Sequence, residues 1–518
     1  QVGILLDGDE LAGIDDIEGY QFTADERYII LDTEREQIYR HSYKADFTIY
    51  NRTNNKLTPV FEAGKKTRLA ALSPDGTKVA FVYDNNLYYQ ELRSGQITQV
   101  TSDGEINKII NGATDWVYEE EFGDDNGFFW SPDSKQIAYY RFDESEVPEF
   151  TLTNYRGELY PEYVTFKYPK VGEKNSEVSV HIYDLAAAEA KQVAATGTEW
   201  EYFPRIKWTP TPGELCVFHM NRHQNKLQLE VVSYAGKRRT LLREENKYYI
   251  DIHDNLTFLN GGKQFVWTSE QDGWNHIYLY NMNGKLERQL TSGEWEVTNL
   301  YGIDQTNGTV FFQAAMESPM RREIYSLPLK GNKKPRKLAG EVGTSSAQFS
   351  GNYDYFVLTF STINRPPRYS VVDRQGKRIR LIEDNADLQN LQQTYQTSEV
   401  EFFDFPIDDD GLRLNGYMIK PKNFNPNIKY PLLMYVYGGP GSQQVVDSWR
   451  GQNYWWFQML AQQGFIVACV DNRGTGARGE EFKKMTYQQL GKYETEDQIA
   501  AARYLGGQPY IDGQRMGI

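Results

Sequence analysis

The sequence has little of several features that mark particular classes of protein. It has only two cysteines in 518 residues, Cys216 and Cys469, which excludes a framework of disulfides and a metal site built from thiolates. Basic residues are outnumbered, with 56 Lys and Arg against 71 Asp and Glu, giving a net charge of −15. This balance argues against a surface that binds phosphate backbones or anionic lipid, so we expect no nucleic-acid partner.

Long apolar runs are also missing. The longest, about Gly464 to Val470, is far shorter than the roughly 20 residues that cross a bilayer, so no transmembrane segment is expected. The residues after Gln1 show neither the basic segment nor the apolar core of a secretory signal. We therefore expect that any such signal has been removed or was not included.

The chain is long enough for three to five ordinary domains or two large ones. Its 40% of hydrophobic residues can fill more than one core. Aromatic residues reach 14% and are concentrated in short alternating runs, which are typical of strands. We therefore predict that residues 1–397 form a β domain.

A repeated unit divides this β region. A turn signal, such as Ser73-Pro74-Asp75-Gly76 or Ser131-Pro132-Asp133-Ser134, precedes an alternating strand, a polar turn and a second strand. Looser copies begin near Phe22, Trp208, Phe258, Ile303 and Phe349. A repeat of roughly 45 residues or more predicts the four-stranded blades of a β-propeller. A series of β-sandwiches is the alternative, although sandwiches do not require this turn at each repeat.

One spacing between turn signals is longer than the others. It contains Tyr168-Pro169-Lys170-Val171-Gly172, a break rich in Pro and Gly. We expect this stretch to belong to an extended arm that leaves its blade.

The pattern changes after about Ser398. Strands are predicted at Val400–Phe405, Leu414–Ile419, Leu432–Tyr437 and Phe465–Val470, helices over 454–463 and 494–505, and a further buried strand from Arg515. This alternation predicts that residues 398–518 form an α/β domain with a parallel sheet.

An α/β sheet with the glycine-rich turn Gly438–Ser442 suggests a hydrolase with a Ser-His-Asp triad. However, the G-x-S-x-G motif is absent, and all six histidines lie between His41 and His276. Because the nucleophile of such enzymes directly follows a central strand, we expect the chain to stop just before it. The turn also lacks the Gly-Lys-Ser/Thr ending of a phosphate-binding loop. Tyr437 lies at the carboxyl end of a predicted strand, where α/β sheets bind ligands.

Three consecutive acids, Glu119, Glu120 and Glu121, lie between Asp115-Trp116-Val117-Tyr118 and Phe122. Such a run is ordinarily a solvated face. The aromatic flanks instead favour partly buried carboxylates that bind a cation, such as the α-amino group of a peptide. Two of the acids can reach one ligand only from a helical turn, because neighbours in a strand point to opposite faces.

Several of these stretches together resemble one family. The runs Asp115–Glu121, Arg40-His41-Ser42-Tyr43 and Tyr435–Gln443 are similar to those of the dipeptidyl peptidase IV group of the prolyl oligopeptidase family, in a bacterial-type member. The similarity continues through Trp130-Ser131-Pro132, Asp471–Gly476 and Glu496–Ile499 and covers most of the chain. It implies an eight-bladed propeller, here incomplete at its amino-terminal end, followed by a truncated α/β-hydrolase domain. It also implies an active site in the cavity between the two domains.

The resemblance also implies roles for individual residues. Glu120 and Glu121 would bind the free ammonium of the substrate, and Arg40 would donate to a substrate carbonyl nearby. The Tyr437 hydroxyl would donate to the oxyanion, and the catalytic Ser, Asp and His would follow Ile518. No metal or cofactor is expected.

The activity implied is that of a serine exopeptidase, which releases Xaa-Pro or Xaa-Ala dipeptides from free amino termini. A tripeptidyl or acylaminoacyl peptidase of the same superfamily is an alternative, as is a non-catalytic propeller that binds proteins. The family further implies a homodimer with the arm near Tyr168 at or near the contact, and a periplasmic, cell-surface or secreted location.

Overall fold

The computed structural model describes residues 6–8, 11, 14, 16–23, 25–62, 64–157, 159–259, 261–331, 333–407 and 411–518. The chain divides into two compact units, Gln1–Asp254 and Asn255–Ile518. Within the described ranges, no helix has both the length and the apolar character that crossing a membrane requires.

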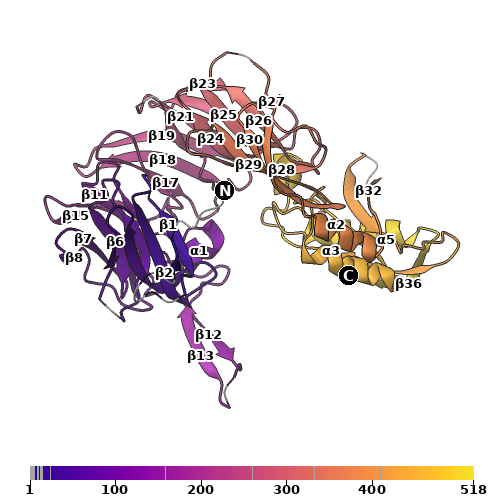
Figure 1. Cartoon of the computed structure of the whole chain (residues 1–518), viewed down its shortest axis with the longest axis horizontal. Coiled ribbons are helices and arrows are strands. Elements are labelled where there is room, and N and C mark those ends of the chain that lie inside the picture. Colours follow the sequence, from indigo (N-terminus) through magenta and orange to yellow (C-terminus); the bar gives the residue numbers. More distant parts are fainter. Residues whose placement is uncertain are drawn as a thin grey trace. The chain divides into compact units, whose positions relative to one another are not determined.

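The first unit consists mainly of antiparallel sheets whose strands follow one another in the sequence (Figure 1). The first sheet contains β1 (Gly19–Phe22), β2 (Tyr28–Gln37), β3 (Tyr43–Asn51) and β4 (Lys56–Pro59). The second contains β5 (Arg68–Leu72), β6 (Lys78–Tyr83), β7 (Asn86–Glu91) and β8 (Ile97–Gln99). The third contains β10 (Phe128–Trp130), β11 (Gln136–Asp143), β14 (Glu177–Asp184) and β15 (Glu189–Ala195), with β9 (Ile109–Asn111) also paired to β11. The fourth contains β16 (Ile206–Trp208), β17 (Glu214–Met220), β18 (Lys226–Ser233) and β19 (Arg238–Glu245).

The turn signals close the hairpins at the start of these sheets. In the turn between β5 and β6, the Ser73 hydroxyl donates to Asp75 at 2.6 Å and accepts from the Lys78 amide at 3.0 Å. Gly76 has a φ of 66°, a conformation that costs glycine little. The alternating strand that follows then buries Val79 to Val82 on both faces. The turn chemistry therefore fixes where each second strand begins.

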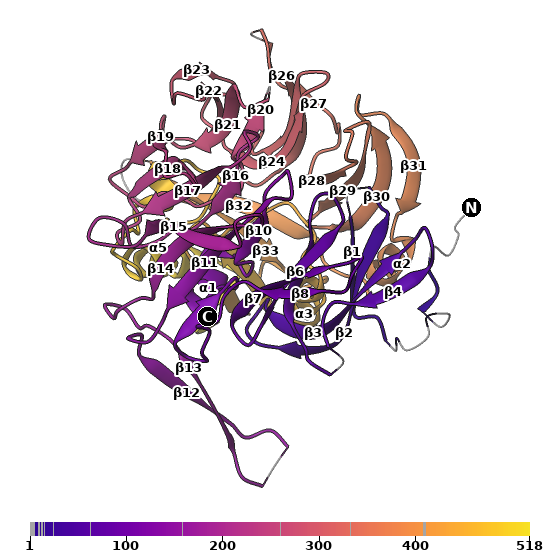
Figure 2. The same cartoon turned by 90° about the vertical axis from the view of Figure 1, so that its left-hand side faces the viewer.

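A two-stranded hairpin, β12 (Glu149–Asn154) and β13 (Glu162–Lys167), interrupts the third sheet between β11 and β14. Figures 1 and 2 show it extending away from the sheets of the first unit. Its side chains are largely exposed, including the large apolar Leu152, Tyr155 and Tyr163. An arm is therefore present in the long spacing, but its second strand ends at Lys167, just before the stretch Tyr168–Gly172 that was expected to belong to it.

The second unit begins with three more sheets of the same kind. Their strands are β20 (Thr257–Leu259), β21 (Gln264–Ser269), β22 (His276–Asn281) and β23 (Leu286–Gln289), then β24 (Val297–Asp304), β25 (Thr309–Ala314), β26 (Glu323–Pro328) and β27 (Arg336–Lys337), then β28 (Thr344–Phe349), β29 (Tyr355–Thr362), β30 (Arg365–Asp373) and β31 (Arg378–Glu383). The described residues thus form seven such sheets. Each of the seven turn signals lies in, or directly after, the first strand of one sheet.

The second unit ends with a five-stranded sheet in the order β32-β33-β35-β34-β36. Its strands and the helices of this region are β32 (Val400–Pro406), β33 (Arg413–Ile419), β34 (Tyr430–Tyr435), β35 (Ile466–Val470), β36 (Ile511–Gly517), α2 (Ala386–Thr394), α3 (Gln452–Gln462), α4 (Glu480–Lys484) and α5 (Lys492–Gly506). Apolar side chains on the two faces of this sheet form two core clusters.

Two predictions for this sheet were wrong in detail. The sheet is mixed, because β33 pairs antiparallel with both β32 and β35, and only the β35–β34 and β34–β36 pairs are parallel. The strand expected to be buried from Arg515 is the end of β36, whose one partner among the described residues is β34. Of its residues only Ile511 is buried.

Candidate functional site

The acidic run lies on a short helix in the first unit, α1 (Trp116–Phe122). Asp115 caps the helix, because its carboxylate accepts from the Tyr118 amide at 2.9 Å and from the Ser176 hydroxyl at 2.7 Å. Gly123, with a φ of 62°, ends the helix. The helical turn that two acids need in order to reach one ligand is therefore present.

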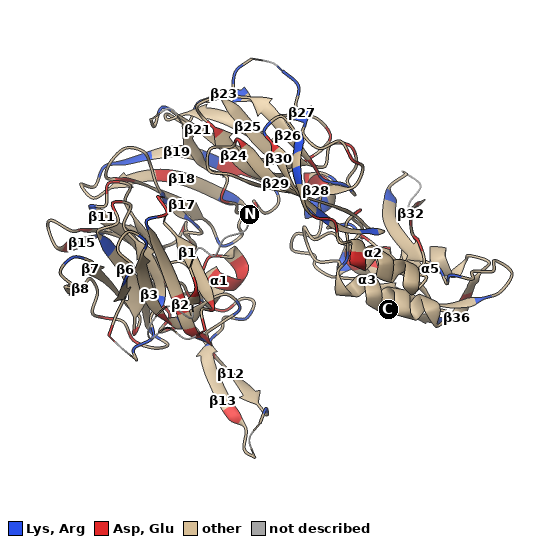
Figure 3. Cartoon of the chain, viewed as in Figure 1, with Lys and Arg blue, Asp and Glu red and all other residues tan. Residues whose placement is uncertain are grey.

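The three glutamates have different surroundings, although they are neighbours in the sequence. Glu119 is buried, with 1% of its surface exposed. The Glu120 side chain is 27% exposed, and Glu121 is exposed. Figure 3 shows a large part of α1 in red, the colour of Asp and Glu. The helix thus turns one carboxylate inward and leaves two accessible to a ligand.

Arg40 lies in the loop between β2 and β3 and pairs with Glu120. Its Nη2 lies 2.7 Å from one carboxylate oxygen and its Nε donates to the other at 3.0 Å. The Arg40 side chain is 68% exposed. An exposed pair of this kind contributes at most about 1 kcal/mol, so it leaves Arg40 able to exchange partners when a ligand arrives.

The same loop is bound more firmly through its backbone. The amides of His41 and Ser42 donate to Oε1 of Glu119 at 2.7 and 2.9 Å. A hydrogen bond to a charged group contributes about 1.5–3 kcal/mol, more than an exposed ion pair does. The buried Glu119 therefore holds the loop in place more strongly than the Arg40–Glu120 pair. Sequence reasoning did not assign this role, because three identical residues in a row do not reveal which of them is buried.

Buried charges lie close to α1. Burial lowers the pKa of Arg68, and the charge of Glu119 is the largest influence opposing that effect. Burial and, to a smaller extent, the charge of Asp115 raise the pKa of Glu144 to about 7. This region of the first unit therefore contains a carboxyl group that titrates close to neutral pH.

Tyr437 belongs to the second unit. The predicted strand was expected to continue through this residue, but β34 ends at Tyr435, so Tyr437 lies in the loop that follows. The residue is 69% exposed, and its hydroxyl makes no hydrogen bond to any residue that the structure describes. The next residue, Gly438, has a φ of 71°. A Cβ there would lie 2.7 Å from the Oδ1 of Asn472, so only glycine fits without a shift.

Two consecutive residues after β35 hold this loop at both ends. Asn472 donates to the Gly438 carbonyl at 3.1 Å. The Asp471 carboxylate accepts from the amides of Gln444 and Val445 at 2.9 and 2.8 Å. Burial raises the pKa of Asp471, and these two amides oppose that rise. In the sequence, Asp471 and Asn472 were only part of a stretch that resembles the family. The structure shows that both residues support the Tyr437 loop.

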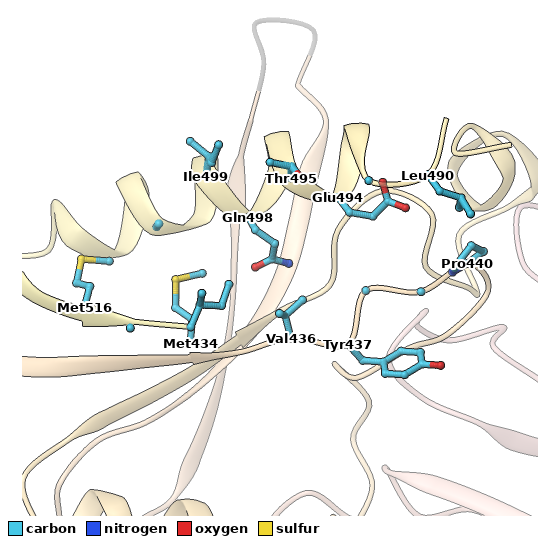
Figure 4. Close-up of a pocket in the computed structure, with 16 residues that line it drawn as sticks. Met434, Val436, Tyr437, Pro440, Leu490, Glu494, Thr495, Gln498, Ile499 and Met516 are labelled. Carbon is cyan, nitrogen blue, oxygen red and sulfur yellow. The ribbon is translucent and has the colours of Figure 1, made fainter. Parts of the chain in front are cut away.

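A cavity of about 750 Å³ opens at the carboxyl end of β34, within the second unit. Figure 4 shows Tyr437 and Pro440 on one side of it, and Glu494, Gln498 and Ile499 of α5 on the other. Open α/β sheets bind ligands at this end of their strands. Among the described residues, no group of three or more His, Cys, Asp or Glu side chains is placed to hold a metal ion.

The structure brings some of the predicted site residues together. Arg40 contacts Glu120 directly, and Glu121 follows Glu120 on the same helix. Tyr437 lies in the other unit, at the mouth of the cavity beside α5. The first group offers accessible carboxylates that can bind a cation, and Tyr437 offers a hydroxyl that can donate a hydrogen bond.

Comparisons with known proteins point to one family. Residues 23–367 match the family described as the dipeptidyl peptidase IV N-terminal region, and residues 451–518 match the prolyl oligopeptidase family. A probable dipeptidyl peptidase 4 of Aspergillus flavus is 30% identical over 93% of this chain, which spans 64% of that protein. A probable dipeptidyl peptidase 4 of Trichophyton verrucosum is 31% identical over 96% of this chain, which spans 68% of that protein.

A solved structure agrees with these sequence matches. The crystal structure of Porphyromonas gingivalis dipeptidyl peptidase 4 is 43% identical, with a TM-score of 0.93 over 98% of this chain and 72% of that one. The architecture is therefore a propeller followed by an α/β-hydrolase domain, and not a series of sandwiches. The comparisons favour neither the tripeptidyl or acylaminoacyl alternative nor a non-catalytic binding module.

Proposed function

Because the chain belongs to the dipeptidyl peptidase IV group of the prolyl oligopeptidase family, we propose that it acts in a serine exopeptidase. This enzyme releases Xaa-Pro or Xaa-Ala dipeptides from peptides with a free amino terminus. The observation that carries the proposal is the placement of Glu120 and Glu121 on α1, beside Arg40.

In this proposal Glu120 and Glu121 bind the ammonium group of the substrate. Two accessible carboxylates on one helical turn attract a cation, and each charge-assisted hydrogen bond to an ammonium is stronger than a neutral one. Arg40 gives up part of its pairing with Glu120 and donates to the substrate carbonyl next to the amino terminus. Its role is orientation, which acts through effective molarity.

Tyr437 acts in the chemical step of this proposal. Its hydroxyl is free of hydrogen bonds to described residues and can donate to the oxyanion that forms when the scissile carbonyl is attacked. An enzyme that anchors the ammonium and cuts after the second residue needs about 7 Å between anchor and scissile bond, the span of two extended residues. The anchor then measures the length of the product.

Three further expectations belong to this proposal. The exposed apolar side chains of the β12–β13 hairpin support a homodimer formed through this arm. A blade count of eight remains a prediction, since the described residues form seven blade-like sheets. The usual location of the family supports a periplasmic, cell-surface or secreted enzyme.

A substrate panel tests the activity. The natural protein that contains this chain is given p-nitroanilides of H-Gly-Pro, H-Ala-Ala-Pro and N-acetyl-Gly-Pro, and product release is followed by absorbance and mass spectrometry. The proposal expects rapid release from H-Gly-Pro alone. Faster cleavage of the tripeptide or of the blocked substrate would refute it.

A further inference from the structure

We propose that Glu119 is a positioning residue, which sets the place of Arg40 relative to the carboxylate of Glu120. This inference rests on the proposed function and assigns a task to the one glutamate of the run that a ligand cannot reach. Glu119 is 1% exposed, so it acts through the loop that it binds and not by contact with substrate.

The geometry of the loop supports this role. Arg40 directly precedes His41 and Ser42, whose amides both donate to Oε1 of Glu119. The Ile38 amide donates to the Ser42 carbonyl at 2.9 Å, which closes the loop into a tight turn between β2 and β3. A tight turn held by two adjacent amides has little freedom to move. The backbone from which the Arg40 side chain extends is thereby fixed to α1.

The helix that carries Glu119 is itself firmly attached. Its first turn is capped by Asp115, and the buried Tyr118 hydroxyl accepts from the Phe203 amide at 2.7 Å. Glu119 and Glu120 are neighbours on this helix. The hydrogen bonds of Glu119 to the loop and the ligand contacts of Glu120 are therefore both anchored on α1. Glu119 thus links the two halves of the anchor, Arg40 on its loop and Glu120 on its helix.

The pattern of hydrogen bonds indicates which chemical feature of Glu119 matters. Both amides donate to the same oxygen, Oε1, while Oε2 is buried and makes no hydrogen bond to any described residue. A glutamine can keep the accepting Oε1 and replace Oε2 with an amide nitrogen. A leucine of similar size removes both acceptors. A comparison of the Gln and Leu variants therefore separates the effect of the two hydrogen bonds from the effect of burying a side chain of this size.

A double-mutant cycle tests the inference in the natural protein. The parameter kcat/KM for H-Gly-Pro-p-nitroanilide is measured for Glu119→Leu, for Arg40→Ala and for the two changes combined, with melting temperatures alongside. We expect Glu119→Leu to lower kcat/KM about 10- to 100-fold, mainly through KM. In the Arg40→Ala background the same change should cost less than about threefold, because no Arg40 is left to position. Glu119→Gln should remain within about threefold of the unchanged protein.

Each other outcome contradicts the inference. Equal losses from Glu119→Leu with and without Arg40 would show that Glu119 serves only general stability. A Glu119→Gln variant as damaged as Glu119→Leu would show that the accepting oxygen is not the cause. If the leucine variant does not accumulate, Glu119→Asp replaces it, since the shorter side chain loosens the same two bonds.

The cycle also separates this inference from the proposed function. Glu120→Ala is measured in the same series with the same substrate. If that variant keeps its full kcat/KM, the ammonium anchor itself is wrong. If Glu120→Ala is impaired while Glu119 and Arg40 act additively, the anchor stands and only the positioning role fails.

Discussion

Replacement of Tyr437 by phenylalanine removes one hydrogen-bond donor and little else. The residue is 69% exposed, and its hydroxyl has no hydrogen-bond partner among the described residues, so no structural bond is lost. The aromatic ring, which lies close to the backbone of Gly439, is kept. We therefore expect the free energy of unfolding to change by less than about 0.5 kcal/mol, as for ordinary surface substitutions.

The effect on catalysis should be much larger. Loss of one oxyanion donor costs about 3–4 kcal/mol of transition-state stabilisation, which corresponds to a fall in kcat of roughly 10²- to 10³-fold. KM should change little, because the donor acts on charge that develops only in the transition state. Steady-state kinetics with H-Gly-Pro-p-nitroanilide measure both parameters. A kcat within about threefold of the unchanged protein would refute the role of this hydroxyl.

A matched control lies on the adjoining strand. Tyr435 is the last residue of β34, and its ring packs against Phe457 with the centroids 5.2 Å apart. Tyr435→Phe makes the same chemical change two residues earlier in the chain. It should leave kcat unchanged. A large fall in kcat for Tyr435→Phe would mean that loss of any tyrosine hydroxyl in this part of the chain impairs the enzyme.

Three more changes test other features of the structure. Asp471→Asn removes a carboxylate that binds two loop amides, so it should destabilise the protein by about 1–3 kcal/mol in urea unfolding and lower kcat. An unchanged midpoint of urea unfolding would argue against a supporting role of this carboxylate. Because burial raises the pKa of Glu144 from 4.5 to about 7, its ionisation should reduce stability as pH rises between these values. Glu144→Gln should thus stabilise the protein more at pH 8 than at pH 5, with a difference of up to about 3 kcal/mol in the free energy of unfolding. The rise in melting temperature should accordingly be larger at pH 8, and equal rises at both pH values would contradict this. Glu270 pairs with Lys483 and the buried Lys484 of α4, so Glu270→Gln should cost about 3–5 kcal/mol, and a loss below about 1 kcal/mol would show that the pairing matters little.

Local sequence signals predicted much of the fold because they reflect local chemistry. The Ser-Pro-Asp-Gly turn, for example, closes its own hairpin through bonds between residues at most five positions apart. The end of β34 was harder to predict. The apolar run continues to Tyr437, but the chain leaves the sheet before Gly438, whose backbone packs against Asn472 from a distant part of the sequence.

The candidate site shows the same division. That the acids need a helical turn followed from the geometry of strands and helices, and α1 provides it. The pairing of Arg40 with Glu120 joins residues 80 positions apart and had no local signal. The separate role of Glu119 depends on burial, which three identical neighbours in a sequence cannot reveal.

The central claim is that Glu120 and Glu121 bind the substrate ammonium, and the most direct measurement removes each partner in turn. We compare kcat/KM for H-Gly-Pro-p-nitroanilide with kcat/KM for an analogue that carries a hydroxyl in place of the amine. The ratio of the two values is measured for the unchanged protein and for the double variant Glu120→Gln, Glu121→Gln. Two lost charge-assisted bonds, each contributing about 1.5–3 kcal/mol, should reduce this ratio at least 100-fold. A ratio that stays the same after both glutamates are replaced would contradict the account.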